Sequence, residues 1–277
     1  MIVVLAGCST IPIQELQGLH DGFFEAQKAG DLLYDEISII INSTGGDSNS
    51  CAPNSRGAPR CFDPSQVSSG TRVQEHASVR ARRMALELIT QYTLALVEVA
   101  EGKSADDIKS NVGQITELAT GLLGLVGVPV PGILGSLTGG PGGAALNGLL
   151  GQLSTIQANA KIRQSLIAER QTVAELVNVL IEDTSVMYQV YFNHRKLRVL
   201  KGLGSEQDEM TTAANYHKSL TAYVLILKQA KRAHERLVEA TRRPLTSIGD
   251  LRVVMEQAIN LKRSAQEFWT VIREVRR

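Results

Sequence analysis

Two of the three cysteines carry the clearest covalent chemistry in the chain. Cys51 and Cys61 lie ten positions apart in the segment 42–70, which is built mainly from Ser, Asn, Gly, Pro and Asp. Such a segment has too little apolar surface to order itself. A disulfide would close a ring of about eleven residues and stabilise the chain by roughly 2.5 to 3 kcal/mol. A metal site fits less well, because the close spacing of metal-binding cysteines is missing and no histidine lies between or just after them. We therefore predict a disulfide loop, with two unpaired thiols as the alternative.

The other reactive side chains form no recognisable catalytic or nucleotide-binding motif. The five histidines are isolated from one another, at positions 20, 76, 194, 217 and 234, and no pair has the spacing of a metalloprotease helix. The glycine-rich stretch in the middle of the chain lacks the lysine of a phosphate-binding loop and follows no predicted strand. We therefore predict a protein that acts by binding rather than as an enzyme, with no metal and no cofactor.

The third cysteine lies near the start of the chain, where Leu5-Ala6-Gly7-Cys8 follows a short apolar run. This sequence resembles the lipobox of bacterial lipoproteins, in which a signal peptidase cuts before the cysteine and the new terminal cysteine receives acyl chains such as palmitate. The resemblance implies that residues 1–7 are the remainder of a signal peptide and that Cys8 is the lipidation site. Stable anchoring takes two or more acyl chains, which a lipoprotein cysteine carries.

The same resemblance implies a compartment. Ser9 rather than an aspartate follows Cys8, which in the enterobacterial pattern implies passage to the outer membrane. Lipidation of Cys8 leaves Cys51 and Cys61 as an even pair, and a disulfide between them would persist in the oxidising periplasm. The alternative is a short buried strand or helix end with a free thiol at Cys8.

The charge balance excludes several classes of partner. Lys and Arg together number 29, and Asp and Glu 28, so there is no basic face large enough for nucleic acid and no acidic tail. A length of 277 residues permits one large or two small domains, and we expect a single domain over 8–277. Only 4% of the residues are aromatic, and the abundance of Ala, Leu, Val, Gln, Glu and Arg favours helices over sheet.

Apolar residues recur at helical spacing along most of the chain. This spacing predicts helices over residues 12–44, 73–101, 104–122, 144–201, 205–241 and 248–272. Gly102, Gly202 and Gly204 lie where these helices end, and Ser104 and Ser205 lie where the following helices begin, as is typical of glycine C-caps and serine N-caps. The sequence therefore predicts an all-α fold, an elongated antiparallel bundle of five or six helices.

The middle of the chain is uncharged. Between Glu117 and Lys161 there is no charged residue, and 11 of the 24 glycines fall there. The segment 118–151 is therefore predicted to form an apolar Gly/Pro-rich hairpin or tip. Its candidates for contact with a membrane or a partner are Leu122, Leu123, Leu125, Val126, Val128, Ile133 and Leu134.

Three roles for this hairpin remain open. It is similar in architecture, without a shared motif, to the tips of α-helical pore-forming toxins, which implies reversible membrane insertion. Spanning a bilayer takes about 20 mostly apolar residues per helix, more than either arm offers. The other two roles are a tip packed against its own bundle and a tip that binds a partner.

Two smaller groups of residues, one basic and one aromatic, also allow a prediction of where they lie in the fold. Three arginines lie close together on the second predicted helix: Arg80, Arg82 and Arg83. We predict a solvated helix face for them, with contact to anionic lipid headgroups as the alternative. Tyr188, Tyr191 and His194 share one helix face, and we predict an interior or interface position because this spacing normally marks packing.

Together these patterns predict a lipid-anchored, extracytoplasmic helical-bundle protein with a binding or scaffolding role in the bacterial cell envelope. It would be held in the outer membrane through Cys8, facing the periplasm or the cell surface, and would bind another envelope protein but no nucleic acid. A homo-oligomer stays open. The alternative is a membrane-perturbing or pore-forming-type protein that inserts the hairpin 118–151 into lipid.

Overall fold

The computed structural model describes residues 13–44, 76–123, 159–242 and 248–275. Within these ranges the chain forms helices and no strand. The helices are α1 (Ile13–Thr44), α2 (Ala77–Ala100), α3 (Ala105–Leu123), α6 (Asn159–Leu200), α7 (Glu206–Arg242) and α8 (Ile248–Val275). The predicted all-α bundle is therefore confirmed. The predicted signal-peptide remainder, Cys8, Cys51 and Cys61 lie outside the described residues.

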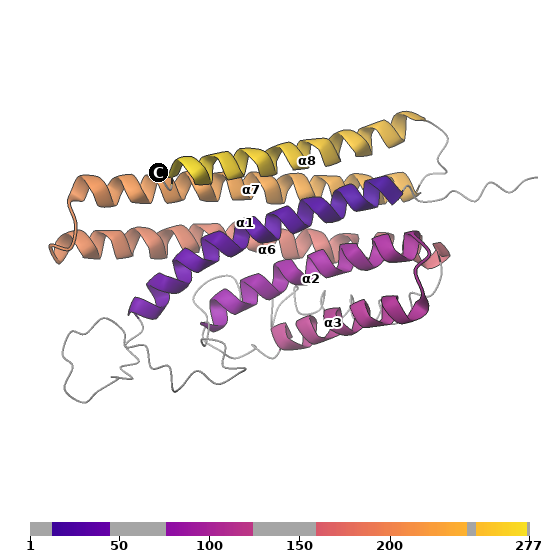
Figure 1. Ribbon diagram of the computed structural model, residues 1–277, viewed down its shortest axis with the longest axis horizontal. Coiled ribbons are helices and arrows are strands. Elements are labelled where there is room, and N and C mark those ends of the chain that lie inside the picture. Colours follow the sequence, from indigo (N-terminus) through magenta and orange to yellow (C-terminus); the bar gives the residue numbers. More distant parts are fainter. Residues whose placement is uncertain (1–12, 45–75, 124–158, 243–247, 276–277) are drawn as a thin grey trace, which may run out of the picture.

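The helices lie side by side in an elongated bundle (Figure 1). α1 runs in the opposite direction to α2 and α7, and α6 and α7 form a long antiparallel hairpin. α1 packs against four helices, α2, α6, α7 and α8. The start of α1, the end of α7 and the start of α8 lie at one end of the bundle, and the turn between α6 and α7 lies at the opposite end. The two ends of the bundle are therefore built from different segments.

The position of α1 follows from its apolar pattern. Its buried residues recur at steps of three and four, the spacing that keeps side chains on neighbouring faces of a helix. They include Leu16, Leu19, Phe23, Ala26, Leu33, Ile37 and Ile40. These side chains enter a single apolar core to which all of the described helices contribute. α1 therefore packs among α2, α6, α7 and α8, whereas α3 joins the bundle through α2.

Glycines end two of the helices, as predicted. Gly102 and Gly202 have φ angles of 73° and 66°, in the left-handed region that glycine adopts without strain. Beyond α6, the amide of Leu203 donates to the carbonyl of Arg198 at 2.9 Å, and the amide of Gly202 donates to the carbonyl of Val199 at 2.9 Å. This pair of hydrogen bonds is the Schellman motif, and it fixes the direction in which the chain leaves α6.

The predicted N-cap of α7 is also confirmed. The hydroxyl of Ser205 accepts a hydrogen bond from the amide of Asp208 at 3.1 Å and donates one to its carboxylate at 2.7 Å. These bonds satisfy a donor that the first turn of a helix leaves free. The turn between α6 and α7 is therefore closed by defined contacts on both sides.

The apolar hairpin is described only at its beginning. Leu122 is fully buried and Leu123 packs half-buried against the core. Leu122 is therefore covered by its own bundle, as in the self-packed alternative, and contact of Leu122 or Leu123 with a membrane or a partner stays a prediction. The remaining candidates, which are Leu125, Val126, Val128, Ile133 and Leu134, lie outside the described residues. Of the helices that the structure describes, none is both long and apolar enough to cross a membrane.

The contact between α1 and α8 depends on a glycine. A Cβ atom placed on Gly22 would lie 1.7 Å from Cδ2 and 2.4 Å from Cγ of Leu261. Leu261 is fully buried, so α8 approaches α1 this closely only because position 22 has no side chain. At Gly113 on α3, in contrast, an added Cβ would meet nothing within 4 Å.

We expect Gly22→Ala to lower the free energy of unfolding by about 1 to 3 kcal/mol, because Leu261 or the whole of α8 must move. The matched control is Gly113→Ala, which should raise it by up to about 1 kcal/mol through the better helix propensity of alanine. Urea unfolding followed by circular dichroism measures both changes. Wild-type stability in Gly22→Ala would contradict the tight packing of α8 on α1.

Candidate functional site

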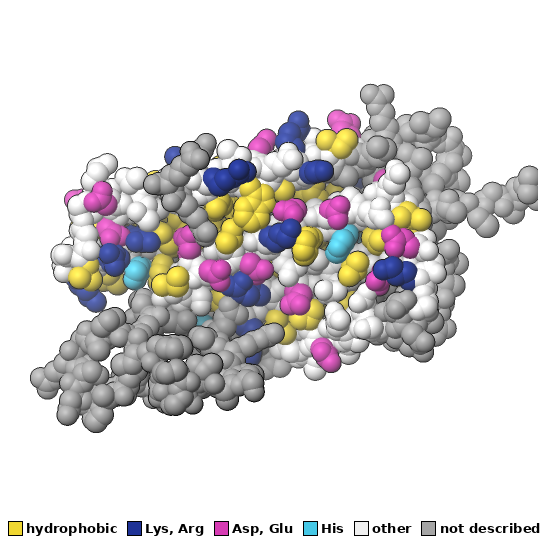
Figure 2. Space-filling view, in the orientation of Figure 1, with side chains coloured by type: hydrophobic (Ala, Val, Ile, Leu, Met, Phe, Trp, Pro, Cys, Tyr) yellow, Lys and Arg dark blue, Asp and Glu magenta, His cyan; other side chains and the backbone are white. Residues whose placement is uncertain are grey.

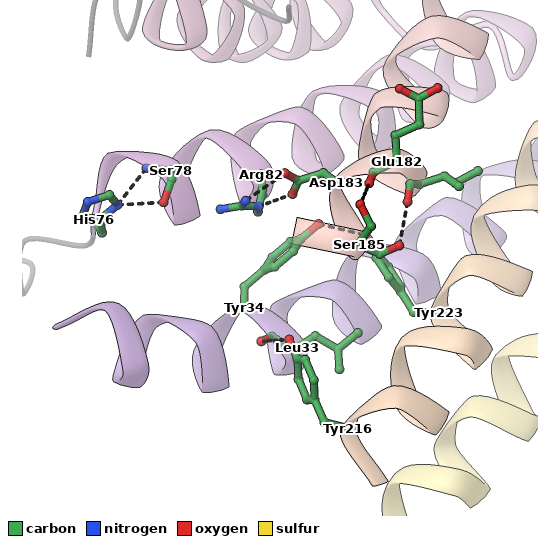
Figure 3. A network of polar contacts seen from close by, with 12 residues as sticks. Leu33, Tyr34, His76, Ser78, Arg82, Glu182, Asp183, Ser185, Tyr216 and Tyr223 are labelled. Carbon is green, nitrogen blue, oxygen red and sulfur yellow. Dashed lines mark hydrogen bonds and ion pairs between the residues drawn. The ribbon is translucent and has the colours of Figure 1, made fainter. Parts of the chain in front are cut away.

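An ion pair between Arg82 on α2 and Asp183 on α6 lies inside the bundle (Figure 3). Nη2 of Arg82 donates to Oδ1 of Asp183 at 2.9 Å, and Nε donates to the other carboxylate oxygen. The two side chains are only 3% and 2% exposed. The prediction of a solvated face is therefore wrong for Arg82, because its counter-charge comes from a helix that lies 101 positions further along the chain.

Tyrosines on α1 and α7 extend this network. The hydroxyls of Tyr34 and Tyr223 form a hydrogen bond of 2.8 Å, and their rings meet edge to face. The hydroxyl of Tyr216 donates to the carbonyl oxygen of Leu33 over 3.4 Å. Burial raises the pKa of all three tyrosines above the ordinary value. All three hydroxyls therefore stay protonated and can act as donors.

Arg83 joins α2 to α1 closer to the surface. Its guanidinium binds the carboxylates of Asp31 at 2.5 Å and Asp35 at 2.6 Å, and these side chains are partly exposed, so each pair contributes modestly to stability. Arg80 is exposed, as expected for a solvated face. The polar contacts of Arg82, Arg83 and the tyrosines thus tie α1, α2, α6 and α7 together, and we interpret them as structural.

The aromatic face predicted on α6 lies partly in the interior. Tyr191 is buried and stacks on Tyr216 with ring centroids 3.9 Å apart, while Tyr188 and His194 are half-buried beside it. His234 on α7 is fully buried, and burial lowers its pKa to about 4, so it is neutral at physiological pH. Among the described residues, no group of three or more His, Cys, Asp or Glu side chains is arranged to hold a metal ion.

A groove of about 510 Å³ lies between α1 and α8. Phe24 and Trp269 form part of its lining together with Ile259, and Phe24 and Ile259 are 43% and 62% exposed. Lys28 and Lys262 also line the groove. Figure 2 shows hydrophobic side chains along this part of the surface, interspersed with basic and acidic ones. The groove therefore combines an open apolar surface with charged edges.

Polar contacts hold the aromatic side chains of this groove in place. The indole N–H of Trp269 donates to Oε2 of Glu25 at 2.9 Å, and Nζ of Lys28 binds Oε1 at 2.9 Å. Burial raises the pKa of Glu25, but the hydrogen bonds from Lys28 and Trp269 outweigh this effect and leave the pKa below its ordinary value. Nζ of Lys28 also lies 4.1 Å from the ring centroid of Phe24. These contacts hold the two aromatic rings of the groove in defined positions.

This arrangement suits the binding of apolar side chains from another protein. Aromatic residues and their pockets contribute most of the affinity at protein interfaces. A groove along two parallel helix surfaces accommodates the apolar face of an amphipathic helix. We therefore take the groove formed by Phe24, Ile259 and Trp269 as the candidate functional site.

Sequence reasoning missed this groove. The apolar spacing placed its residues in the predicted helices 12–44 and 248–272 without pointing to a surface that they share. One signal was available, because Phe24 directly follows Phe23 and adjacent residues point in different directions from a helix. Phe23 is fully buried, so Phe24 had to lie outside the same core face. Nothing in the sequence could show that Ile259 covers the other side.

The structure shows an all-α helical bundle with an open, partly apolar groove between α1 and α8. Comparison of the chain with protein-family models, with curated proteins and with solved structures found no match in any of the three. The function is therefore inferred from the residues themselves.

We expect Arg82→Leu to lower the free energy of unfolding by about 3 to 5 kcal/mol, because it leaves the carboxylate of Asp183 buried without a counter-charge. The matched control, Arg83→Leu, breaks pairs that are partly exposed and should cost about 1 kcal/mol. Urea unfolding at pH 7 measures both. The double variant Arg82→Leu/Asp183→Leu should recover much of the loss, and a double variant no more stable than Arg82→Leu would refute the role of the ion pair.

Proposed function

We propose that this protein is a lipid-anchored, extracytoplasmic helical bundle that binds a partner protein in the bacterial cell envelope as a scaffold or accessory subunit. The observation that carries the proposal is Leu5-Ala6-Gly7-Cys8, and four residues separate Cys8 from Ile13, the first residue of α1. Acyl chains on Cys8 would hold the start of α1 close to the outer-membrane surface. A disulfide between Cys51 and Cys61 belongs to the same proposal, because the periplasm is oxidising.

The groove between α1 and α8 is the binding surface in this proposal. Phe24, Ile259 and Trp269 offer apolar contacts, and Lys28 and Lys262 lie beside them. Asp21 and Glu25 line the groove as well, and Lys28 is already paired with Glu25. The partner that fits is therefore an amphipathic helix whose apolar face enters the groove and whose polar edges carry charges of both signs, with an acidic residue opposite Lys262. Because the aromatic rings are already held in place, binding orders few additional side chains and loses little conformational entropy.

The anchor is tested by labelling growing cells with radioactive palmitate. The wild-type protein should take up the label and fractionate with membranes, whereas Cys8→Ala should do neither, because the acyl chains are attached at that cysteine. The matched control is Cys51→Ala, which keeps Cys8 and should be labelled like the wild type. Equal labelling of the wild type and Cys8→Ala would overturn the proposed anchor.

The groove is tested by placing a photoreactive amino acid at position 259 and irradiating intact cells. We expect a crosslink to an envelope protein, identified by mass spectrometry, and a yield roughly tenfold lower when Phe24→Asp is added, because a charge then occupies the apolar surface. The same photoreactive residue at position 225 of α7, where Leu225 is 48% exposed, serves as the control. Crosslinking that is equally strong at position 225, or unaffected by Phe24→Asp, would refute the groove as the binding surface.

A further inference from the structure

The turn between α6 and α7 exposes three leucines at one end of the bundle. Leu197, Leu200 and Leu203 are 46%, 81% and 60% exposed, and Leu200 is the most exposed of the large hydrophobic side chains in the described part of the chain. Single exposed leucines are normal on a protein surface, but three within seven residues form a cluster that needs an explanation. We call residues 195–203 the α6–α7 tip.

Hydrogen bonds to Glu209 on α7 hold the α6–α7 tip in a fixed conformation. Nη1 of Arg195 and Nε of Arg198 both donate to the carboxylate of Glu209, at 3.1 and 2.7 Å. Nη2 of Arg198 also donates to the carbonyl oxygen of Leu203 at 3.1 Å. The hydrogen bond from Arg198 is the main reason why the pKa of Glu209 is lowered, so this carboxylate stays charged under mildly acidic conditions. Leu197 and Leu200 on the last turn of α6, and Leu203 just after it, are therefore exposed on a segment that these hydrogen bonds hold in place, with Gly202 in the conformation described above.

Basic side chains surround these leucines. The segment 195–203 contains four basic residues and no acidic one. Arg195 and Arg198 are committed to the buried carboxylate on α7, whereas Lys196 and Lys201 are exposed. Nζ of Lys196 lies 4.7 Å from the ring centroid of Phe192, so Lys201 is the better placed of the two to reach anionic groups outside the protein.

Acidic residues at the start of α7 reduce the positive charge of the α6–α7 tip but leave its net charge positive. Glu209 is occupied by two arginines, and the carboxylate of Asp208 accepts the hydroxyl of Ser205. Glu206 is exposed in the first turn of α7, where an acidic residue is favoured by the helix dipole. Residues 195–209 carry four basic and three acidic side chains, a net charge of +1. The leucines must therefore supply most of the binding energy of any contact made by the tip.

We infer that the α6–α7 tip inserts its leucines into the surface of an anionic lipid bilayer. The tip is the turn at the end of a helical hairpin (Figure 1), and apolar side chains that project from such an end fit between headgroups, whereas a protein partner would have to supply a matching cavity. Leucines at the acyl boundary with lysines at headgroup level are the arrangement by which peripheral proteins hold to membranes. Lys196 and Lys201 have the reach to contact phosphate groups while their hydrocarbon stems stay near the leucines.

The position of the α6–α7 tip adds a second membrane surface to the proposed function. The start of α1 and the α6–α7 tip lie at opposite ends of the bundle (Figure 1), and the 42 residues of α6 span about 63 Å. With Cys8 acylated in one bilayer, an upright bundle presents the tip to a second membrane surface. This bridging geometry rests on the proposed function, whereas the contact of the tip with lipid does not.

The full chain carrying Cys8→Ala tests the tip without an acyl anchor. It is sedimented with vesicles of phosphatidylcholine containing phosphatidylglycerol, or of phosphatidylcholine alone, and the bound fraction is measured. We expect binding that is stronger to the phosphatidylglycerol vesicles. Leu200→Glu in this background should lower the partition coefficient about tenfold, because a leucine side chain no longer enters the apolar phase. The matched control is Leu225→Glu, an equally drastic change on an exposed part of α7, which should bind like the parent.

A fluorescence measurement tests the same contact with a variant whose tip remains apolar. Trp269 is the only tryptophan of the chain, so Trp269→Phe combined with Leu203→Trp places the only indole at the tip. Its emission should shift to shorter wavelength when phosphatidylglycerol vesicles are added. Absence of binding in both vesicle arms, unchanged binding of Leu200→Glu, or an unshifted emission would each overturn the inference, whatever the palmitate labelling shows. The exposed leucines of the tip would then be assigned to contact with another protein.

Discussion

Arg82 and Asp183 meet inside the bundle, where both side chains are almost fully buried, and both charges are tolerated only while they face each other. An isolated buried charge costs several kcal/mol, so α2 and α6 cannot slide or rotate relative to each other without a steep penalty. Apolar contacts alone would allow such slippage, because one leucine replaces another at little cost. The hydrogen bond between Tyr34 and Tyr223 adds α1 and α7 to the same arrangement. We interpret this network as the constraint that fixes the register of the helices.

The candidate binding groove is a consequence of how closely α8 packs on α1. Gly22 lets the side chain of Leu261 reach the backbone of α1, which draws the two helices together along their inner faces. Phe24 and Ile259 then remain on the outer side of the same contact, where no other helix of the described chain covers them. Glu25 holds Trp269 beside them. One close packing contact thus supplies both stability and a surface for a partner.

The proposed functions use three different regions of the bundle. The sequence around Cys8 stands next to the start of α1, the groove runs along the side formed by α1 and α8, and the exposed leucines lie at the α6–α7 tip. These regions do not overlap, so a partner in the groove leaves both ends free. An elongated bundle is well suited to such a division, because its length separates the ends while the shared core keeps them rigidly connected.

The sequence by itself determined the helices, their ends at Gly102 and Gly202, and the all-α class. These features are local, since they depend on the spacing of apolar side chains over a few turns and on single residues with a special backbone conformation. Only the tertiary structure decided that Arg82 is buried, that Leu122 packs into the core, and that Phe24 and Ile259 line one groove. Each of these depends on which face of a helix meets which distant neighbour, and that choice is made by packing over the whole bundle rather than by any short stretch of residues.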